Sequence, residues 1–198
     1  IISTGAAMLS EVLRGSELSI EYGAESVALL KCTSIYPCPP EHVNLAGIKT
    51  LMSVWDGPVG FSDHTLGIEA ACASIVLGAS IIEKHFTLDR SMPGHDHHFS
   101  ATPDEMKKLV SGVRKIQKML GDKTISPVGE EFNFRKISRR FLVAYKDIVK
   151  GEIITKDKVC VKRPEDGPGI NPENLDIILG RVATNNVKEG KSLKWTDI

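Results

Sequence analysis

The chain has 198 residues, 41% of them hydrophobic and 25% charged, so it can bury a sizeable core as one large domain or two small ones. Lysine plus arginine and aspartate plus glutamate both total 25, so no net charge favours nucleic acid or an anionic membrane as partner, and specificity must lie in a local site for a small molecule. No apolar run is long enough to span a bilayer, and no basic region precedes a cleavable apolar stretch, which predicts a cytoplasmic protein.

The first 120 residues predict strands that alternate with helices. The opening segment, Ile1–Gly5, is an apolar pair followed by small turn residues, which is typical of the end of a strand. Further strands are expected at 27–32, 59–61 and 81–85, and helices at 10–22, 44–54, 68–77 and 103–120. This alternation predicts parallel βα units, in which chemistry sits at the carboxyl ends of the strands.

The character of the sequence changes after Leu120. Residues 122–139 are polar and contain Pro127, which is typical of a linker that crosses a surface. Short strands are expected at 140–145 and 158–162, and two stretches that resemble each other each contain a turn on a glycine, at 147–154 and 186–193. We therefore predict three parts, which are an α/β region at 1–121, a linker at 122–139 and a small α+β module at 140–198.

The cysteine pattern does not indicate a disulfide framework. The four cysteines lack close paired spacing, and a chain of this size does not need disulfides to be stable, so we interpret them as free thiols: Cys32, Cys38, Cys72 and Cys160. A zinc site built on the first two is an alternative with less support, because no second pair accompanies them.

Polar residues follow three of the expected strands, at 32–37, 62–65 and 83–86. Side chains at neighbouring strand ends of a parallel βα array point into one mouth, so we expect His64 and His85 to converge. Imidazole suits divalent metals such as Mn, Zn, Fe and Co, and two histidines leave positions open for water and substrate. The spacing alone is equally compatible with His64 as a helix cap and His85 as a core residue.

The loop at 89–100 contains three histidines and two acids around Gly94. Such a loop can bring Asp96 to a metal-bound hydroxyl or to a sugar hydroxyl, and Asp96 is our candidate catalytic residue. A surface loop that happens to be rich in histidine is the alternative, and it is favoured for each of the three histidines: His95, His97 and His98.

Small hydroxyl residues next to strand ends are candidates for a phosphate or carboxylate site, and they are Ser3, Ser34 and Ser62. Taken singly, each is more often a turn or cap residue. In the small module, Arg163 stands before Pro164 and a loop rich in glycine and proline, which suits planar recognition of a carboxylate or an amide oxygen. A solvated basic residue is the alternative interpretation of Arg163.

Five motifs occur in an order that resembles the N-acetylneuraminate (sialic acid) synthase family. They are Ile-Ser-Thr-Gly at 2–5, Cys-Thr-Ser-Ile-Tyr-Pro at 32–37, Ser-Asp-His-Thr at 62–65, Glu-Lys-His-Phe-Thr-Leu-Asp at 83–89 and Gly-His-Asp-His at 94–97. The tail at 140–198 resembles the SAF (antifreeze-protein-like) domain that these enzymes carry. The resemblance covers nearly the whole chain.

The resemblance implies the second half of a (β/α)8 TIM-type barrel followed by an SAF domain. The family condenses phosphoenolpyruvate with an N-acyl hexosamine such as N-acetylmannosamine, which gives a nine-carbon 2-keto sugar acid and phosphate. The mechanism that it implies is metal polarisation of the sugar aldehyde, attack by C3 of phosphoenolpyruvate and addition of water at C2 before phosphate leaves.

Site residues carry over where the motifs match. His64 and His85 would bind Mn²⁺ or Mg²⁺, and the three serines at positions 3, 34 and 62 would surround phosphoenolpyruvate. Tyr36 and Asp96 would lie near the sugar or the metal-bound water. Arg163 would reach the acyl group of a sugar bound in the partner subunit, because these enzymes are similar to domain-swapped homodimers.

Some features depart from the family pattern. The family usually has Pro where His95 stands and often His where Lys31 stands, so the acyl sugar stays open among the precursors of sialic, legionaminic and pseudaminic acids; Asp96 followed by His97 favours the first two. A complete barrel needs about 250 residues, and about 120 precede the linker, so we expect an upstream half that carries the family's acid/base glutamate and phosphate-binding lysines.

Two alternatives follow. Without that upstream half, we expect the chain alone to be inactive. It would then be a fragment or a binding module that keeps the metal and sugar surface. A related aldolase or another phosphoenolpyruvate-condensing enzyme is the other alternative, and the SAF-like tail disfavours it.

Overall fold

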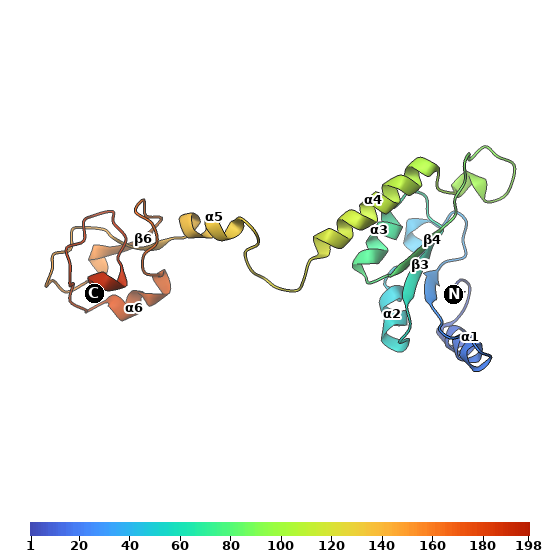
Figure 1. Cartoon of the computed structure of the whole chain (residues 1–198), viewed down its shortest axis with the longest axis horizontal. Coiled ribbons are helices and arrows are strands. Elements are labelled where there is room, and N and C mark those ends of the chain that lie inside the picture. Colours follow the sequence, from blue (N-terminus) through green and yellow to red (C-terminus); the bar gives the residue numbers. More distant parts are fainter. The chain divides into compact units, whose positions relative to one another are not determined.

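A computed structural model describes all residues of the chain, Ile1 to Ile198. The chain forms two compact units, Ile1–Asp122 and Lys123–Ile198, which are described separately below (Figure 1). No helix in either unit has the length and apolar character needed to cross a membrane.

The first unit is built on a parallel four-stranded sheet. Its strands are β1 (Ile2–Ser3), β2 (Leu29–Cys32), β3 (Val59–Asp63) and β4 (Ile81–Lys84), and their order in the sheet is the same as their order in the chain. All three pairings are parallel, which confirms the predicted α/β class. Right-handed connections between strands in sequential order place the intervening helices on one face of the sheet.

Four helices follow the four strands: α1 (Leu9–Glu21), α2 (Gly47–Val54), α3 (Glu69–Val76) and α4 (Pro103–Leu120). Short 3₁₀ turns lie at Pro40–His42 and His97–Phe99. Helix α4 has the bounds that the sequence predicts, because Thr102 and Glu105 form a capping box in which each accepts a hydrogen bond from the other's backbone N–H.

The core of the first unit lies between the sheet and its helices. Leu29 of β2 and Phe61 of β3 point to the same side of the sheet and pack in one cluster with Val12 of α1 and Ile48 of α2. Because successive strand residues alternate in direction, the residues between them point to the opposite face. The two faces therefore differ, and the helices cover the one that carries this apolar cluster.

The second unit is a small module with its own core. It contains α5 (Glu131–Ser138), the antiparallel pair β5 (Phe141–Ala144) and β6 (Val159–Lys162), α6 (Leu175–Ile178), and 3₁₀ turns at Lys156–Lys158, Pro172–Asn174 and Trp195–Asp197. Its buried cluster contains Leu142, Ala144, Ile148, Ile154, Ile170, Ile178, Ala183, Val187 and Leu193.

The two stretches that resemble each other in sequence lie side by side in this module. Ile148 and Val187 form an antiparallel bridge, and each backbone N–H donates to the other's carbonyl oxygen at 2.9 Å. Asp147 accepts hydrogen bonds from the ammonium of Lys188 and from the backbone N–H of Glu189. The internal similarity of the sequence thus corresponds to two equivalent turns that pair with each other.

The segment at 122–139, which the sequence predicts to be a linker, contains the helix α5 at Glu131–Ser138. The helix is only two turns long, so its sequence is too short to show a helical repeat. Its hydrophobic side chains remain exposed in the module: Phe132, Phe134 and Ile137.

Candidate active site

His64 and His85 follow directly on the ends of the paired strands β3 and β4, and their side chains meet. The ring centroids lie 5.2 Å apart with an angle of 66° between the ring planes. His64 is buried, whereas the side chain of His85 is 30% exposed. The structure therefore brings together the two residues that the sequence predicts as metal ligands.

A backbone contact determines which nitrogen of the His64 ring carries the proton. Nδ1 of His64 lies 2.8 Å from the carbonyl oxygen of Thr33, in the loop that follows β2. A carbonyl oxygen only accepts hydrogen bonds, so Nδ1 must carry the proton, and Nε2 of the neutral ring keeps its lone pair. Metal-binding histidines in proteins are typically oriented in this way, by donation from the other ring nitrogen.

Two further aromatic rings enclose the histidine pair. The ring centroid of Tyr36 lies 4.2 Å from that of His64 and 5.9 Å from that of His85. Phe99 is buried, and its centroid lies 4.9 Å from that of His85 and 5.6 Å from that of Tyr36. Nothing in the sequence predicts this role for Phe99, because a single apolar residue in a polar loop has no periodic pattern around it.

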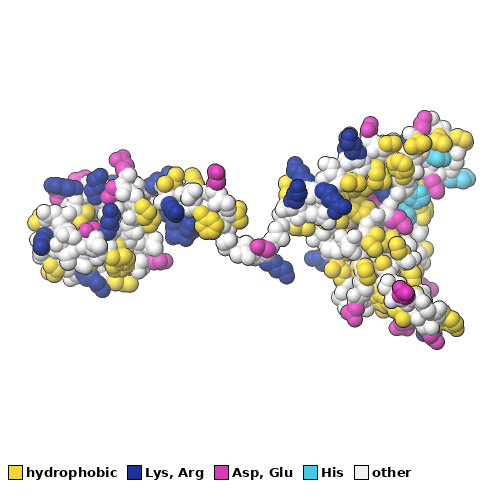
Figure 2. Space-filling model, viewed as in Figure 1, with side chains coloured by type: hydrophobic (Ala, Val, Ile, Leu, Met, Phe, Trp, Pro, Cys, Tyr) yellow, Lys and Arg dark blue, Asp and Glu magenta, His cyan; other side chains and the backbone are white.

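Asp96 lies at the open side of this cluster. Its carboxylate oxygen is 3.6 Å from Nδ1 of His85, and its side chain is 65% exposed. Arg90 holds the end of the loop, since it donates to the carbonyl oxygen of Ser100 and to the carboxylate of Glu105 on α4. Figure 2 shows histidine side chains gathered over one part of the surface of this unit.

The metal-binding potential of the site rests on two histidines. In the whole chain, no group of three or more His, Cys, Asp or Glu side chains is arranged to hold a metal ion. Two imidazoles that bind one ion through bonds of about 2.1 Å have ring centroids roughly 4.5 to 5.3 Å apart, and the observed 5.2 Å falls in that range. This separation is compatible with a shared ion, and metal binding by the pair remains a prediction.

The hydroxyl of Ser62 is already engaged. Ser62 and Glu83 are partners in the β3–β4 register, and Oγ of Ser62 donates to a carboxylate oxygen of Glu83 at 2.6 Å. A serine has one proton to donate, so Ser62 can offer a ligand only acceptor positions while this bond persists. Glu83 is not among the predicted site residues, although it lies two residues before His85 and its side chain therefore points to the same side of the sheet.

The other two candidate serines stand at neighbouring strand ends. Ser3 ends β1, and Ser34 follows β2. The two loops approach closely, because a Cβ atom on Gly5 would collide with Oγ of Ser34 in its present rotamer and crowd Sγ of Cys32. No hydrogen bond joins the three serines to one another, and their shared role in binding an anion remains a prediction.

A buried ion pair supports the histidine strands from the helix side of the sheet. Nζ of Lys84 donates to a carboxylate oxygen of Asp63 at 2.8 Å and to the carbonyl oxygen of Thr65 at 2.7 Å. The other carboxylate oxygen of Asp63 accepts from the backbone N–H and the hydroxyl of Thr65. Both charged side chains are almost fully buried, with exposed fractions of 4% and 0%.

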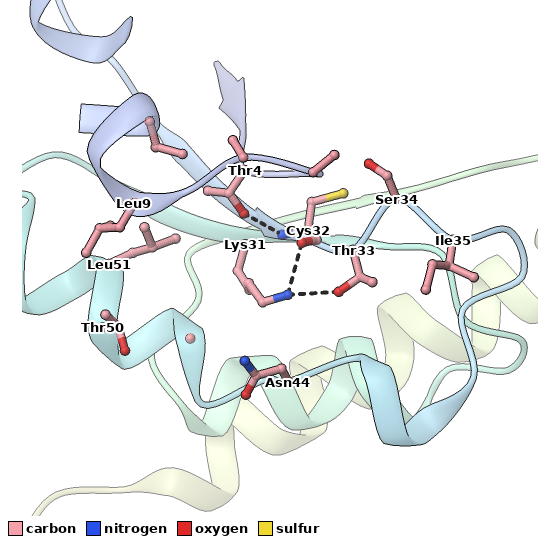
Figure 3. Close-up of a pocket in the computed structure, with 14 residues that line it drawn as sticks. Thr4, Leu9, Lys31, Cys32, Thr33, Ser34, Ile35, Asn44, Thr50 and Leu51 are labelled. Atoms are coloured by element: carbon pink, nitrogen blue, oxygen red, sulfur yellow. Dashed lines mark hydrogen bonds between the residues drawn. The ribbon is translucent and has the colours of Figure 1, made fainter. Parts of the chain in front are cut away.

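A hollow of about 510 Å³ lies nearby, between α1, α2 and the ends of β1 and β2 (Figure 3). Its charged residue is Lys31, whose Nζ donates to the carbonyl oxygen of Cys32 and to the hydroxyl of Thr33. Burial lowers the pKa of Lys31 below its ordinary value. Ser34 also lines this hollow, but neither His64 nor His85 does, so the hollow is separate from the histidine pair.

Arg163 belongs to the second unit. It follows β6, and its Nε donates to the carbonyl oxygen of Ser138 at 3.1 Å. Contact between Arg163 and a sugar remains a prediction.

The four cysteines of the chain are free.

Comparison with known proteins adds to this geometry. Residues 1–125 match the model of the NeuB family, and residues 139–198 match that of the SAF domain. The chain is 41% identical over 196 residues to an N,N'-diacetyllegionaminic acid synthase and 38% identical over 197 residues to a pseudaminic acid synthase, both from Campylobacter jejuni. These alignments cover 98% and 100% of this chain but 58% and 57% of the two relatives.

A solved structure is similar over part of the chain. It is an N-acetylneuraminic acid (sialic acid) synthetase from Leptospira borgpetersenii in complex with citrate, with a TM-score of 0.60 and 38% identity; the match covers 68% of this chain and 48% of that one. The family model spans more than half of the chain, and the arrangement of strands and histidines agrees with the motifs on which the resemblance rests. The chain belongs to the NeuB family.

Proposed function

We propose that the chain is part of a synthase that condenses phosphoenolpyruvate with an N-acyl hexose such as N-acetylmannosamine to give a nine-carbon 2-keto sugar acid (a nonulosonic acid) and phosphate. The observation that carries the proposal is the convergence of His64 and His85 at adjacent strand ends, with Nδ1 of His64 committed to the carbonyl oxygen of Thr33. The relatives named as legionaminic and pseudaminic acid synthases support the class of product.

The four βα units are proposed to be the second half of a (β/α)8 barrel. Two features support this. The strands follow one another in sequential parallel order, as barrel strands do, whereas a doubly wound sheet reverses its order near the middle. The chain also spans less than three fifths of its curated relatives, which leaves length for further units in a complete enzyme.

The proposed metal is Mn²⁺ or Mg²⁺, held by His85 and by Nε2 of His64. Such an ion would supply Lewis-acid polarisation of the sugar aldehyde. Binding and orientation of the substrates and of water would depend on the residues of the chain. Asp96 is exposed beside His85, where its carboxylate can accept a hydrogen bond from water or from a sugar hydroxyl and so orient it.

The remaining roles concern binding. Tyr36 is half exposed, and its ring packs at a tilt against His64, so we propose that it contacts the sugar. Ser3 and Ser34 are proposed to donate hydrogen bonds to phosphoenolpyruvate. Ser62 is proposed to do so only after a rearrangement, because its hydroxyl already donates to the carboxylate of Glu83. Arg163 is proposed to reach the acyl group of a sugar in the partner subunit of a domain-swapped homodimer.

A phosphate-release assay tests the proposed activity. The full-length protein that contains this chain would be incubated with phosphoenolpyruvate, Mn²⁺ and, in separate reactions, N-acetylmannosamine and other N-acyl hexoses. We expect phosphate release that depends on one of these sugars and on the metal, together with a 2-keto acid of the expected mass. Failure with every N-acyl hexose would refute the proposal.

A second candidate is a binding module without turnover. It is favoured by the observation that the chain spans only part of the length of its relatives. Under this alternative the isolated chain binds Mn²⁺ and an N-acyl hexose but releases no phosphate. Calorimetry on the 198-residue chain and the phosphate assay on the full-length protein separate the two, because the synthase proposal requires turnover in the second experiment.

A further inference from the structure

We propose that the buried Asp63–Lys84 pair is a clamp that positions His64 and His85, and that its effect is on the geometry of the site rather than on the stability of the fold. The proposal deepens the function proposed above, since it concerns the same two histidines. Neither Asp63 nor Lys84 was among the residues that the sequence motifs assign to the site.

The clamp lies immediately before both histidines. Asp63 and Lys84 are cross-strand partners at the last paired position of β3 and β4. Nζ of Lys84 lies 2.8 Å from the carboxylate of Asp63, so this ion pair joins the two strands at the point where the histidines begin. A change in the separation of these strand ends would change the distance between the two imidazole rings.

Lys84 also holds the far side of His64. Its Nζ donates to the carbonyl oxygen of Thr65, while the carboxylate of Asp63 accepts both hydrogen bonds offered by Thr65. His64 is therefore bracketed, because the residues before and after it are both bonded to the side chain that precedes His85. This arrangement fixes the backbone at His64 and thereby directs its Nδ1 to the carbonyl of Thr33.

The pair itself does not face the candidate site. Asp63 lies two residues after Phe61 and so points to the same side of the sheet, where Phe61 packs into the helix-side core. Lys84 likewise points to the same side as Ile82, which lines a groove against α3 and α4. Both side chains are nearly inaccessible. They act through the histidines and are positioning residues, not catalytic ones.

The energetics of buried ion pairs agree with a positional role. Removal of two charges from water costs about as much free energy as their mutual attraction returns, so replacing both partners by well-packed uncharged residues of similar volume, hydrophobic ones above all, is often neutral for stability. Replacing one partner alone leaves a buried charge without its counter-ion and is strongly destabilising. A double neutral variant therefore separates site geometry from fold stability.

The test is the variant Asp63→Asn/Lys84→Met in the 198-residue chain. The control for removal of a lysine–aspartate pair as such is Asp147→Asn/Lys188→Met, which removes a solvent-exposed pair of similar length, 2.7 Å, from the second unit. Histidine-selective ¹⁵N NMR reports the ring tautomer of each of the six histidines, and circular dichroism reports the fold. Mn²⁺ affinity is measured in parallel by calorimetry.

We expect the double variant to keep its circular dichroism spectrum but to lose the Nδ1–H signature of His64, with Mn²⁺ binding about 10- to 100-fold weaker. The control should retain both. An unchanged His64 signature in the folded double variant overturns the clamp. This readout does not need a metal, so failure of the wild-type chain to bind Mn²⁺ counts against the proposed function and not against the clamp.

Should the double variant unfold, Lys84→Arg tests the same point. Arginine keeps a positive charge against Asp63, but its larger planar head cannot place one donor at both the Asp63 carboxylate and the Thr65 carbonyl. A shifted His64 ring signal in this folded variant supports the clamp, and an unshifted one overturns it.

Discussion

Nδ1 of His64 lies 2.8 Å from the carbonyl oxygen of Thr33, and this contact leaves Nε2 as the ring atom free to bind a ligand. The ring is thus oriented by the backbone of the neighbouring βα loop. The same loop carries Tyr36, whose ring packs on His64. One loop therefore both orients a candidate metal ligand and covers one of its faces.

Replacement of either His64 or His85 by alanine should reduce Mn²⁺ affinity at least about 100-fold, because the site offers no more than two protein ligands and each variant loses one of them. Isothermal titration calorimetry measures the effect. His42→Ala is the matched control, since His42 lies in an exposed 3₁₀ turn and should leave binding unchanged. Stoichiometric binding at wild-type affinity in the His64→Ala/His85→Ala variant would refute the assignment.

The pKa values of two lysines should depart in opposite directions from the ordinary value of 10.5. Burial lowers the pKa of Lys31, whereas the hydrogen bond and charge of Asp147 raise the pKa of Lys188. In competitive acetylation across a pH series, followed by mass spectrometry, the reactivity of Lys31 should rise at lower pH than that of Lys188. The reverse order would contradict the burial seen around Lys31. Asp147→Asn should lower the midpoint for Lys188 only.

Acid should weaken the contribution of Glu105 to stability. The backbone N–H of Thr102, and then Arg90, lower the pKa of Glu105 from its ordinary value of 4.5. A group whose pKa is depressed by folding stabilises the native state above the unfolded-state pKa, and the effect is lost as the pH falls through the folded-state pKa. The difference in unfolding free energy between wild type and Glu105→Gln should therefore be constant near pH 6 to 7 and shrink below about pH 4.5.

Urea denaturation at a series of pH values measures this difference. Asp104→Asn, a change at the neighbouring exposed position of the same helical turn, is the control for the general effect of charge at the start of α4. A difference that grows on acidification would contradict the depressed pKa of Glu105.

The two cores should respond separately to mutation. Leu142 is fully buried in the cluster of the second unit, and Leu29 is fully buried in that of the first. Leu142→Ala should cost about 2 to 5 kcal/mol and accelerate amide hydrogen exchange in residues 123–198 only. Leu29→Ala is the reciprocal variant and should act on residues 1–122. Equal acceleration throughout the chain in either variant would show that the units unfold together.

The sequence predicted those elements whose signals are local. Helix α4 has the expected bounds because its cap residues, Thr102 and Glu105, and its apolar repeat all lie within one segment. Strand β3 extends two residues beyond the prediction, through Ser62 and Asp63. These polar residues read as a loop in sequence, but they are buried in the strand because Glu83 and Lys84, on the next strand, satisfy them.

The same distinction applies to the site. The approach of His64 to His85 was expected because parallel strand ends share one edge of a sheet. The surroundings of the pair were not expected, since Phe99, Glu83 and the Asp63–Lys84 clamp gain their roles from partners on other strands and loops. Nothing in the residues next to them along the chain encodes those partners.

The sequential order of the sheet leaves β1 and β4 as its two outer strands. On its outer side, such a strand has backbone N–H and C=O groups that are not paired within the sheet, and an extended chain can form hydrogen bonds with them. Each outer strand therefore has one edge at which a further strand can be added through main-chain hydrogen bonds. The sheet can grow at both ends without any change in the pairing of its four strands.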